Sequence, residues 1–155
     1  HLTGHSLAAF GGVETPEALA LRRLSDQLVD ELKAADVLVI GAPMYNFGLP
    51  STLKAWFDHV LRAGVTFRYT ETGPEGLVGQ KRVIVASARG GLYAADADQD
   101  NQERHLRALL GFIGLNDVTV VRADGLALGE APRAEGLARG DAQVAALNAG
   151  LLQAA

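Results

Sequence analysis

Val37-Leu38-Val39-Ile40 runs directly into Gly41-Ala42-Pro43-Met44-Tyr45-Asn46-Phe47-Gly48-Leu49-Pro50, a loop rich in glycine and proline. Four consecutive branched apolar residues are typical of a strand that is buried on both faces, as in a parallel sheet covered by helices. Similar apolar runs at 82–87 and 118–121 predict two further strands, the last one nearer to an edge of the sheet.

Helical patterns separate these strands. Thr15 at the N-cap and Pro16 at the first helical position predict a helix that closes at 35–36, and Ser51 is expected to cap the next one. Two more helices are predicted, one ending at Gly114 and one containing the apolar positions 137–151. Gly-rich residues 64–80 indicate a hairpin. The alternation predicts a single α/β domain over 1–155, a doubly wound parallel sheet in three α/β/α layers. Ligands of such sheets bind outside the carboxyl ends of the strands.

Composition excludes several classes of protein. The 155 residues are 48% hydrophobic and 21% charged, which is ordinary for a globular domain. A net charge of −4 predicts neither a nucleic-acid partner nor a membrane surface partner. No apolar run approaches the length of a membrane span. The absence of cysteine excludes disulfides and fits a reducing compartment, so we expect a cytoplasmic protein. The histidines lack metal-ligand spacing, and no metal site is predicted.

The loop at 41–50 follows the first strand and offers groups that suit a flat heterocycle. Met44, Tyr45 and Phe47 can contact a ring face, and Asn46 brings both a donor and an acceptor. The alternative is a plain strand-to-helix turn whose aromatic side chains join the core.

The second candidate loop, 87–93, follows the next strand. Its Gly90 and Gly91 allow the backbone to approach a ligand closely, and their amides can stabilise negative charge on a ring. A simple turn is again the alternative. The chain contains no nucleophile elbow, no dinucleotide fingerprint and no P-loop, so a reaction carried by a cofactor fits better than side-chain catalysis.

Four segments together resemble the FMN-dependent NADH-azoreductases, also called NAD(P)H:quinone reductases, which have a flavodoxin-like fold. The likeness runs from about residue 15 to the end of the chain. The segments are Ala42–Phe47 with Leu53–Asp58, Ala63–Leu77, Ser87–Gly91 and Leu110–Gly114.

The resemblance implies a homodimer with one FMN per subunit at the carboxyl edge of the sheet. NADH or NADPH would deliver hydride to the flavin and leave, and a quinone or azo compound would then accept two electrons. No side chain would act as nucleophile or acid–base group. By this likeness the isoalloxazine is lined by Pro43, Met44, Tyr45, Asn46 and Phe47, and its pyrimidine side by Arg89, Gly90 and Gly91. The substrate pocket would contain Tyr69, Tyr93 and Phe112, with Phe112 offered by the other subunit.

The chain departs from this family in three places. Ala88 stands where a serine is usual, and Tyr93 where histidine is frequent. The family's first strand, its Ser-rich phosphate-binding loop, the following helix and the second strand have no counterpart, and nothing in residues 1–15 replaces them. We therefore expect an incomplete view of the working protein, with a bare sheet edge beside Val37–Ile40. The alternatives are an electron carrier of the flavodoxin type and a cofactor-free interaction module.

Overall fold

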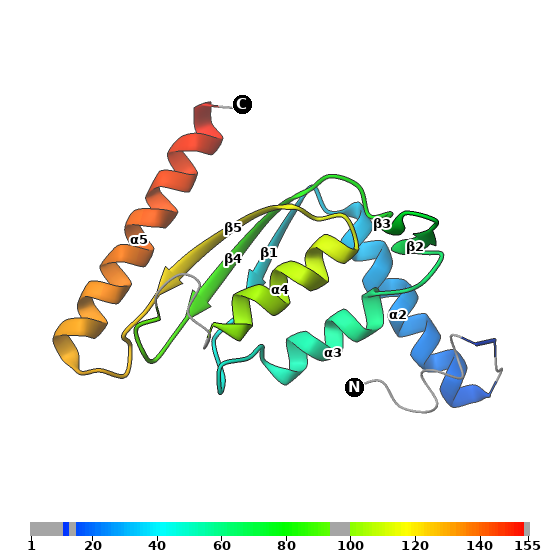
Figure 1. Cartoon of the computed structure of the whole chain (residues 1–155), viewed down its shortest axis with the longest axis horizontal. Coiled ribbons are helices and arrows are strands. Elements are labelled where there is room, and N and C mark those ends of the chain that lie inside the picture. Colours follow the sequence, from blue (N-terminus) through cyan, green and yellow to red (C-terminus); the bar gives the residue numbers. More distant parts are fainter. Residues whose placement is uncertain (1–10, 13–14, 94–99, 154–155) are drawn as a thin grey trace.

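A computed structural model describes residues 11–12, 15–93 and 100–153, with side chains up to residue 150. The loops predicted at 1–15 and 92–101 fall largely outside the described residues. The elements follow in the order α2 (Pro16–Ala34), β1 (Val37–Gly41), α3 (Ser51–Val60), β2 (Phe67–Thr70), β3 (Gly73–Gly76), β4 (Arg82–Ala88), α4 (Asn101–Phe112), β5 (Asp117–Ala123) and α5 (Glu130–Gln153) (Figure 1).

The three predicted strands form one parallel sheet in the order β1-β4-β5. Val37 lies opposite Arg82 in the first pair, and Arg82 lies opposite Asp117 in the second. The arrowheads of all three strands point to the same end of the molecule (Figure 1). The predicted parallel sheet and the edge position of the last strand are confirmed, and the predicted hairpin is the antiparallel pair β2–β3.

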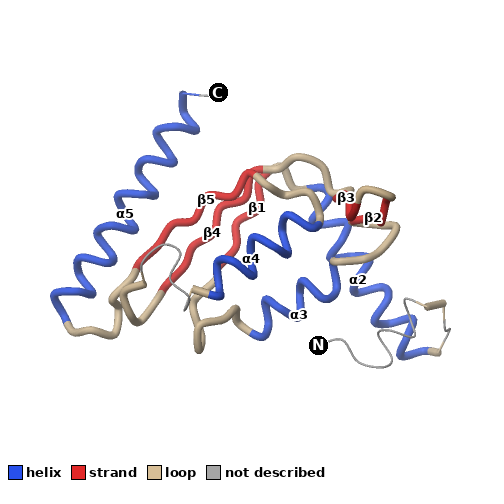
Figure 2. The backbone as a smooth tube through the Cα atoms, viewed as in Figure 1, coloured by secondary structure: helices blue, strands red, loops and turns tan. Residues whose placement is uncertain are grey.

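The hydrophobic core lies between the sheet and helices α2, α3 and α4. Val83 and Val85 point into it from β4, and Phe57 and Val60 meet them from α3. Leu110 closes the same core from α4. Figure 2 shows α3 and α4 crossing this face of the sheet, while α5 runs beside β5. Every second residue of β4 is buried, and the predicted helices cover the face to which these residues point.

Among the described residues, the opposite face of the sheet is covered only along β5. Gly140 of α5 approaches Ala123 there, where a Cβ on the glycine would be 3.7 Å from the alanine Cβ. On β1, by contrast, Val37 is 45% exposed and Val39 is 68% exposed. The expectation that Val37–Ile40 is buried on both faces is therefore wrong for the described residues, because none of them covers this side of β1. The bare edge expected beside β1 is present, since β1 pairs only with β4 among these strands.

The two helix starts differ in how they are capped. The Thr15 hydroxyl accepts a hydrogen bond of 3.2 Å from the Ala18 amide, as the sequence predicts. Ser51 does not cap the next helix, because Pro50 holds the N-cap position and Ser51 is already helical. Pro50 has no side-chain acceptor to replace it, so this helix end has no side-chain cap.

The β2–β3 hairpin is held against the end of α4 through Gly76. A Cβ at residue 76 would be 2.1 Å from the Gly114 nitrogen and from the Ile113 carbonyl carbon. These are main-chain atoms that cannot rotate away, so the contact requires glycine. Gly114 itself has a φ of +93°, which ends the helix region in a left-handed turn.

The Gly76→Ala variant is expected to lose about 2 kcal/mol or more of unfolding free energy, because backbone must move to admit the methyl group. Gly41→Ala is the matched control, since nothing lies within 4 Å of a Cβ built there. Urea denaturation of both variants measures the difference. Equal stability of the two variants would contradict the close contact between hairpin and helix.

His59 on α3 is a buried titratable group. Its Nδ1 atom has no hydrogen-bond partner among the described residues. Burial lowers the pKa of His59 below its ordinary value of 6.5, although the nearby Asp58 carboxylate acts in the opposite direction. Folding therefore favours the neutral imidazole of His59.

The free energy of unfolding should fall as the pH is lowered from about 7.5 to about 5.5. In this range the unfolded chain takes up a proton at residue 59 that the folded chain resists, so acid favours unfolding. The His59→Gln variant should show a weaker dependence over the same range, whereas His105→Gln, at an exposed position, serves as the control. Chemical denaturation at several pH values decides this, and identical slopes for wild type and His59→Gln would refute the assignment.

Candidate functional site

A tight turn follows β1 at the carboxyl end of the sheet. The Tyr45 amide donates to the Gly48 carbonyl at 3.1 Å, and the Gly48 amide donates back to Tyr45 at 2.9 Å. Asn46 and Phe47 between them have φ values of +46° and +65°. Positive φ at both central residues is the pattern of a type I′ turn, which asparagine tolerates and phenylalanine rarely adopts. The turn therefore stores local strain, a feature concentrated at functional sites.

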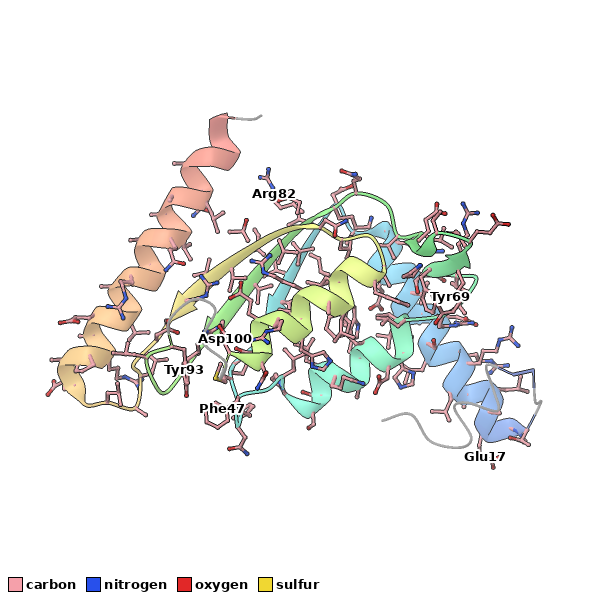
Figure 3. The ribbon with its side chains drawn as sticks, in the orientation of Figure 1. Glu17, Phe47, Tyr69, Arg82, Tyr93 and Asp100 are labelled. Carbon is pink, nitrogen blue, oxygen red and sulfur yellow. The ribbon has the colours of Figure 1, made fainter. Side chains whose placement is uncertain are left out.

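The turn presents its side chains outward. Tyr45 is 64% exposed, and Asn46 and Phe47 are also exposed, while Pro43 and Met44 are half-buried. The alternative in which the aromatic residues join the core is thus wrong for Tyr45 and Phe47. Tyr93, from the second candidate loop, lies beside Phe47 with a ring-centroid distance of 6.2 Å and an interplanar angle of 90° (Figure 3). The structure brings these two predicted residues together.

The second loop is built by main-chain pairing with the segment after β5. The carbonyls of Arg89, Gly90 and Gly91 accept hydrogen bonds from the amides of Leu126, Ala127 and Gly125, at 3.1, 3.0 and 2.9 Å. The amides of Gly90 and Gly91 make no hydrogen bond to any described residue. Both amides lie at the carboxyl end of β4, and their predicted role toward a ring stays a prediction.

Tyr93 folds back over this loop. A Cβ added at Gly91 would lie 3.0 Å from the Tyr93 hydroxyl oxygen and 3.1 Å from the ring carbon that carries it. The lack of a side chain at Gly91 thus leaves room for the ring of Tyr93. Tyr93 therefore contacts both candidate loops, one through Phe47 and one through Gly91.

The Arg89 side chain does not point toward this surface. It is 2% exposed, and its Nη1 donates to the Asp100 carboxylate at 2.8 Å. Its amide donates to the Ala123 carbonyl at 2.9 Å. The Arg89 side chain is thus turned into the chain, and both main-chain groups of this residue are paired there, whereas its Nη2 atom has no hydrogen-bond partner among the described residues. The expected contact between Arg89 and a ligand stays a prediction.

Two further carboxylates surround the Arg89 guanidinium, at 3.6 Å for Glu103 and 3.7 Å for Asp124. Burial alone would raise the pKa of Glu103, but hydrogen bonds from Arg122 and Arg107 outweigh it and lower this pKa. Burial raises the pKa of Asp124, only partly offset by Arg89. The loop after β4 is thus anchored on an internal ion cluster.

Sequence reasoning missed Gln102, which is 1% exposed and donates to the Ala42 carbonyl at 2.7 Å. It lies in the first turn of α4, two residues after Asp100, whose side chain accepts from the Glu103 amide as the helix cap. An acidic N-cap is visible in the sequence, but a glutamine near a helix start carries no signal that it reaches another strand.

Tyr69 and Phe112 lie elsewhere. Both contact Phe67 at the hairpin, with ring-centroid distances of 5.5 and 4.5 Å, and Tyr69 is 73% exposed. Figure 3 places Tyr69 at the opposite end of the molecule from Phe47 and Tyr93. Within one chain, the predicted substrate pocket is therefore split, with Tyr93 in one group and Tyr69 with Phe112 in the other.

Two kinds of feature are absent from the described part of the chain. No described helix is long and apolar enough to cross a membrane. Those residues also contain no group of three or more histidine or acidic side chains arranged to hold a metal ion.

The chain was compared with known proteins. A family model described as "Flavodoxin-like fold" matches residues 1–147. The "FMN-dependent NADH:quinone oxidoreductase 2" of Pseudomonas fluorescens strain Pf0-1 is 59% identical over 120 residues, which cover 77% of this chain and 60% of that protein. The "FMN-dependent NADH:quinone oxidoreductase" of Azospirillum brasilense is 50% identical over 155 residues, which cover 95% of this chain and 74% of that protein.

Solved structures agree with this result. An FMN-dependent NADH-azoreductase of Bacillus anthracis strain Ames Ancestor, solved with FMN, matches with a TM-score of 0.86 and 30% identity, covering 97% of this chain and 74% of the solved one. The chain spans about 60% of the length of the Pseudomonas relatives, 60% for the Pseudomonas fluorescens protein and 59% for a Pseudomonas aeruginosa one. By family model, sequence and fold, this chain belongs to the flavodoxin-like family, among the relatives of the FMN-dependent NADH:quinone oxidoreductases.

Proposed function

We propose that this chain forms the ring-binding part of an FMN-dependent NAD(P)H oxidoreductase that reduces quinones and azo compounds by two electrons. The observation that carries the proposal is the pair of loops at the carboxyl ends of β1 and β4. One loop exposes Tyr45, Asn46 and Phe47, and the other keeps the amides of Gly90 and Gly91 unbonded among the described residues.

These groups fit a flavin ring. The aromatic side chains offer an apolar surface to a flat heterocycle, Asn46 can both donate to and accept from its polar edge, and two main-chain amides are placed to face a negative charge. When bound, FMN supplies the redox chemistry by accepting hydride from NAD(P)H and passing two electrons to the acceptor. The names of the relatives, which state FMN and NADH, support this assignment.

The chain's own contribution is positioning. The turn at 45–48 and the adjacent ring of Tyr93 would offer the surface on which a planar substrate is oriented against the flavin. The Gly90 and Gly91 amides stabilise negative charge on the ring they face. No side chain is assigned a proton-transfer step.

A homodimer is part of the proposal. Tyr69 and Phe112 are remote from the two loops within one chain, so they contribute to a substrate pocket only when a second copy brings its hairpin to the loops of the first. The exposure of Tyr69 leaves it available for such a contact. A cytoplasmic location completes the proposal and rests on the absence of cysteine.

The purified protein should take up FMN and then oxidise NADH in the presence of menadione or an azo dye, because the family's acceptors are small and aromatic. Visible absorbance reports flavin uptake, and loss of NADH absorbance reports turnover. Uptake of FMN without turnover would favour an electron carrier instead. Failure to take up FMN would favour a cofactor-free interaction module and would remove the oxidoreductase proposal.

Asn46→Gly should weaken FMN binding by about tenfold, the expected loss when hydrogen bonds to a ring edge disappear. Glycine adopts φ +46° without strain, so the turn itself should persist and the melting temperature should not fall. Asn116→Gly, at another exposed asparagine, is the control. Flavin fluorescence titration measures the dissociation constants, and an unchanged value for Asn46→Gly would exclude this side chain from the ring site.

A further inference from the structure

A chain of buried hydrogen bonds leads from the Arg89 guanidinium to the base of the first loop. Arg89 Nε donates to the Ser87 hydroxyl at 3.2 Å, and that hydroxyl donates to Gln102 Oε1 at 3.2 Å. Gln102 Nε2 then donates to the Ala42 carbonyl at 2.7 Å. Four residues from β4, α4 and the end of β1 are thereby joined in one series, which we call the relay.

The direction of every bond in the relay is forced by chemistry. A main-chain carbonyl only accepts, so the amide nitrogen of Gln102 must face Ala42 and its oxygen must face Ser87. The Ser87 hydroxyl must then donate to that oxygen, which leaves its lone pairs to accept from the Arg89 side chain, which can only donate. The Ala42 carbonyl therefore fixes the orientation of Gln102, and the Arg89 guanidinium holds the Ser87 hydroxyl that donates to the Gln102 oxygen.

The relay lies in a dry, closely packed region. Arg89, Ser87 and Gln102 are all buried. The space among their side chains contains no cavity for water, with a volume of about 0 Å³. No water fits beside these side chains in the folded chain, so their polar atoms depend on one another for partners.

The relay holds one side of Pro43, and the sheet holds the other. Ala42 is fixed through its carbonyl by Gln102, and the Met44 amide donates to the Ala88 carbonyl at 2.9 Å. Ala88 directly precedes Arg89, so the same few residues of β4 determine both attachments. The turn at 45–48 begins immediately after this double attachment.

We propose that Arg89, Ser87 and Gln102 are positioning residues that set the turn at 45–48 against the loop at 89–91. If the chain binds FMN as proposed above, the relay also governs the affinity for the flavin ring; this part of the inference rests on the proposed function. Arg89 thus acts on the site from inside the protein, through Ser87 and Gln102.

The decisive variants are Ser87→Ala and Gln102→Met, with Ser25→Ala as the matched control. Ser25 is also fully buried, and its hydroxyl donates to the His59 carbonyl at 2.6 Å, but it joins α2 to α3 far from the loops. Amide hydrogen exchange is measured on the peptide covering 42–49. FMN dissociation constants are measured by fluorescence titration on the same proteins.

Both relay variants should exchange about three- to tenfold faster in this peptide than wild type, the change expected for the loss of one buried hydrogen bond. Ser25→Ala should leave the exchange of 42–49 unchanged even where it lowers the melting temperature by a similar amount. FMN affinity should fall by a similar factor in the relay variants only.

Unchanged exchange at 42–49 in Ser87→Ala and Gln102→Met would overturn the inference, as would equal acceleration in Ser25→Ala. Faster exchange with unaltered FMN affinity would overturn the proposed control of ligand binding. If wild type takes up no FMN, the proposed function fails, while the exchange measurement still decides whether the relay positions the turn.

Discussion

The architecture depends on the pairing of β4 along both of its edges. Five of its residues pair with β1 on one side and all seven pair with β5 on the other, so the loops that leave all three strands emerge at one end. Ala88 extends this pairing to the Met44 amide, and Arg89 extends it to the Ala123 carbonyl. The hydrogen bonds of the sheet therefore continue into the two loops of the candidate site, and β4 determines where these loops lie.

Burying the Arg89 guanidinium removes its charge from water, and three carboxylates surround it inside the chain. Removing a guanidinium from water is unfavourable unless its donors are used, and a buried ion pair by itself is weak support for stability. Asp100 accepts one donor, and Ser87 accepts another. We infer that these contacts orient the Arg89 side chain more than they stabilise the fold, because they allow the guanidinium a single orientation.

The sequence predicted the elements well because the apolar periodicity is local. The strand at 82–88 and the hairpin at 67–76 are visible from a few neighbouring residues each. The position of Arg89 was not predictable in this way, since its partners Asp100 and Asp124 come from distant segments. The exposure of Val39 was missed for a similar reason, because an apolar run does not state whether another element covers it. The separation of Tyr69 from Tyr93 also depends on tertiary placement, which residue identities cannot supply.

The left-handed backbone of Phe47 has a consequence for how this chain would respond to selection. A bulky residue at φ +65° costs about 1–2 kcal/mol relative to one that accepts this conformation easily. Selection for heat resistance alone would therefore replace Phe47 with glycine or asparagine early. The same replacement would remove the exposed ring that contacts Tyr93. Thermal stability and the shape of the loop surface are thus opposed at a single position of this chain.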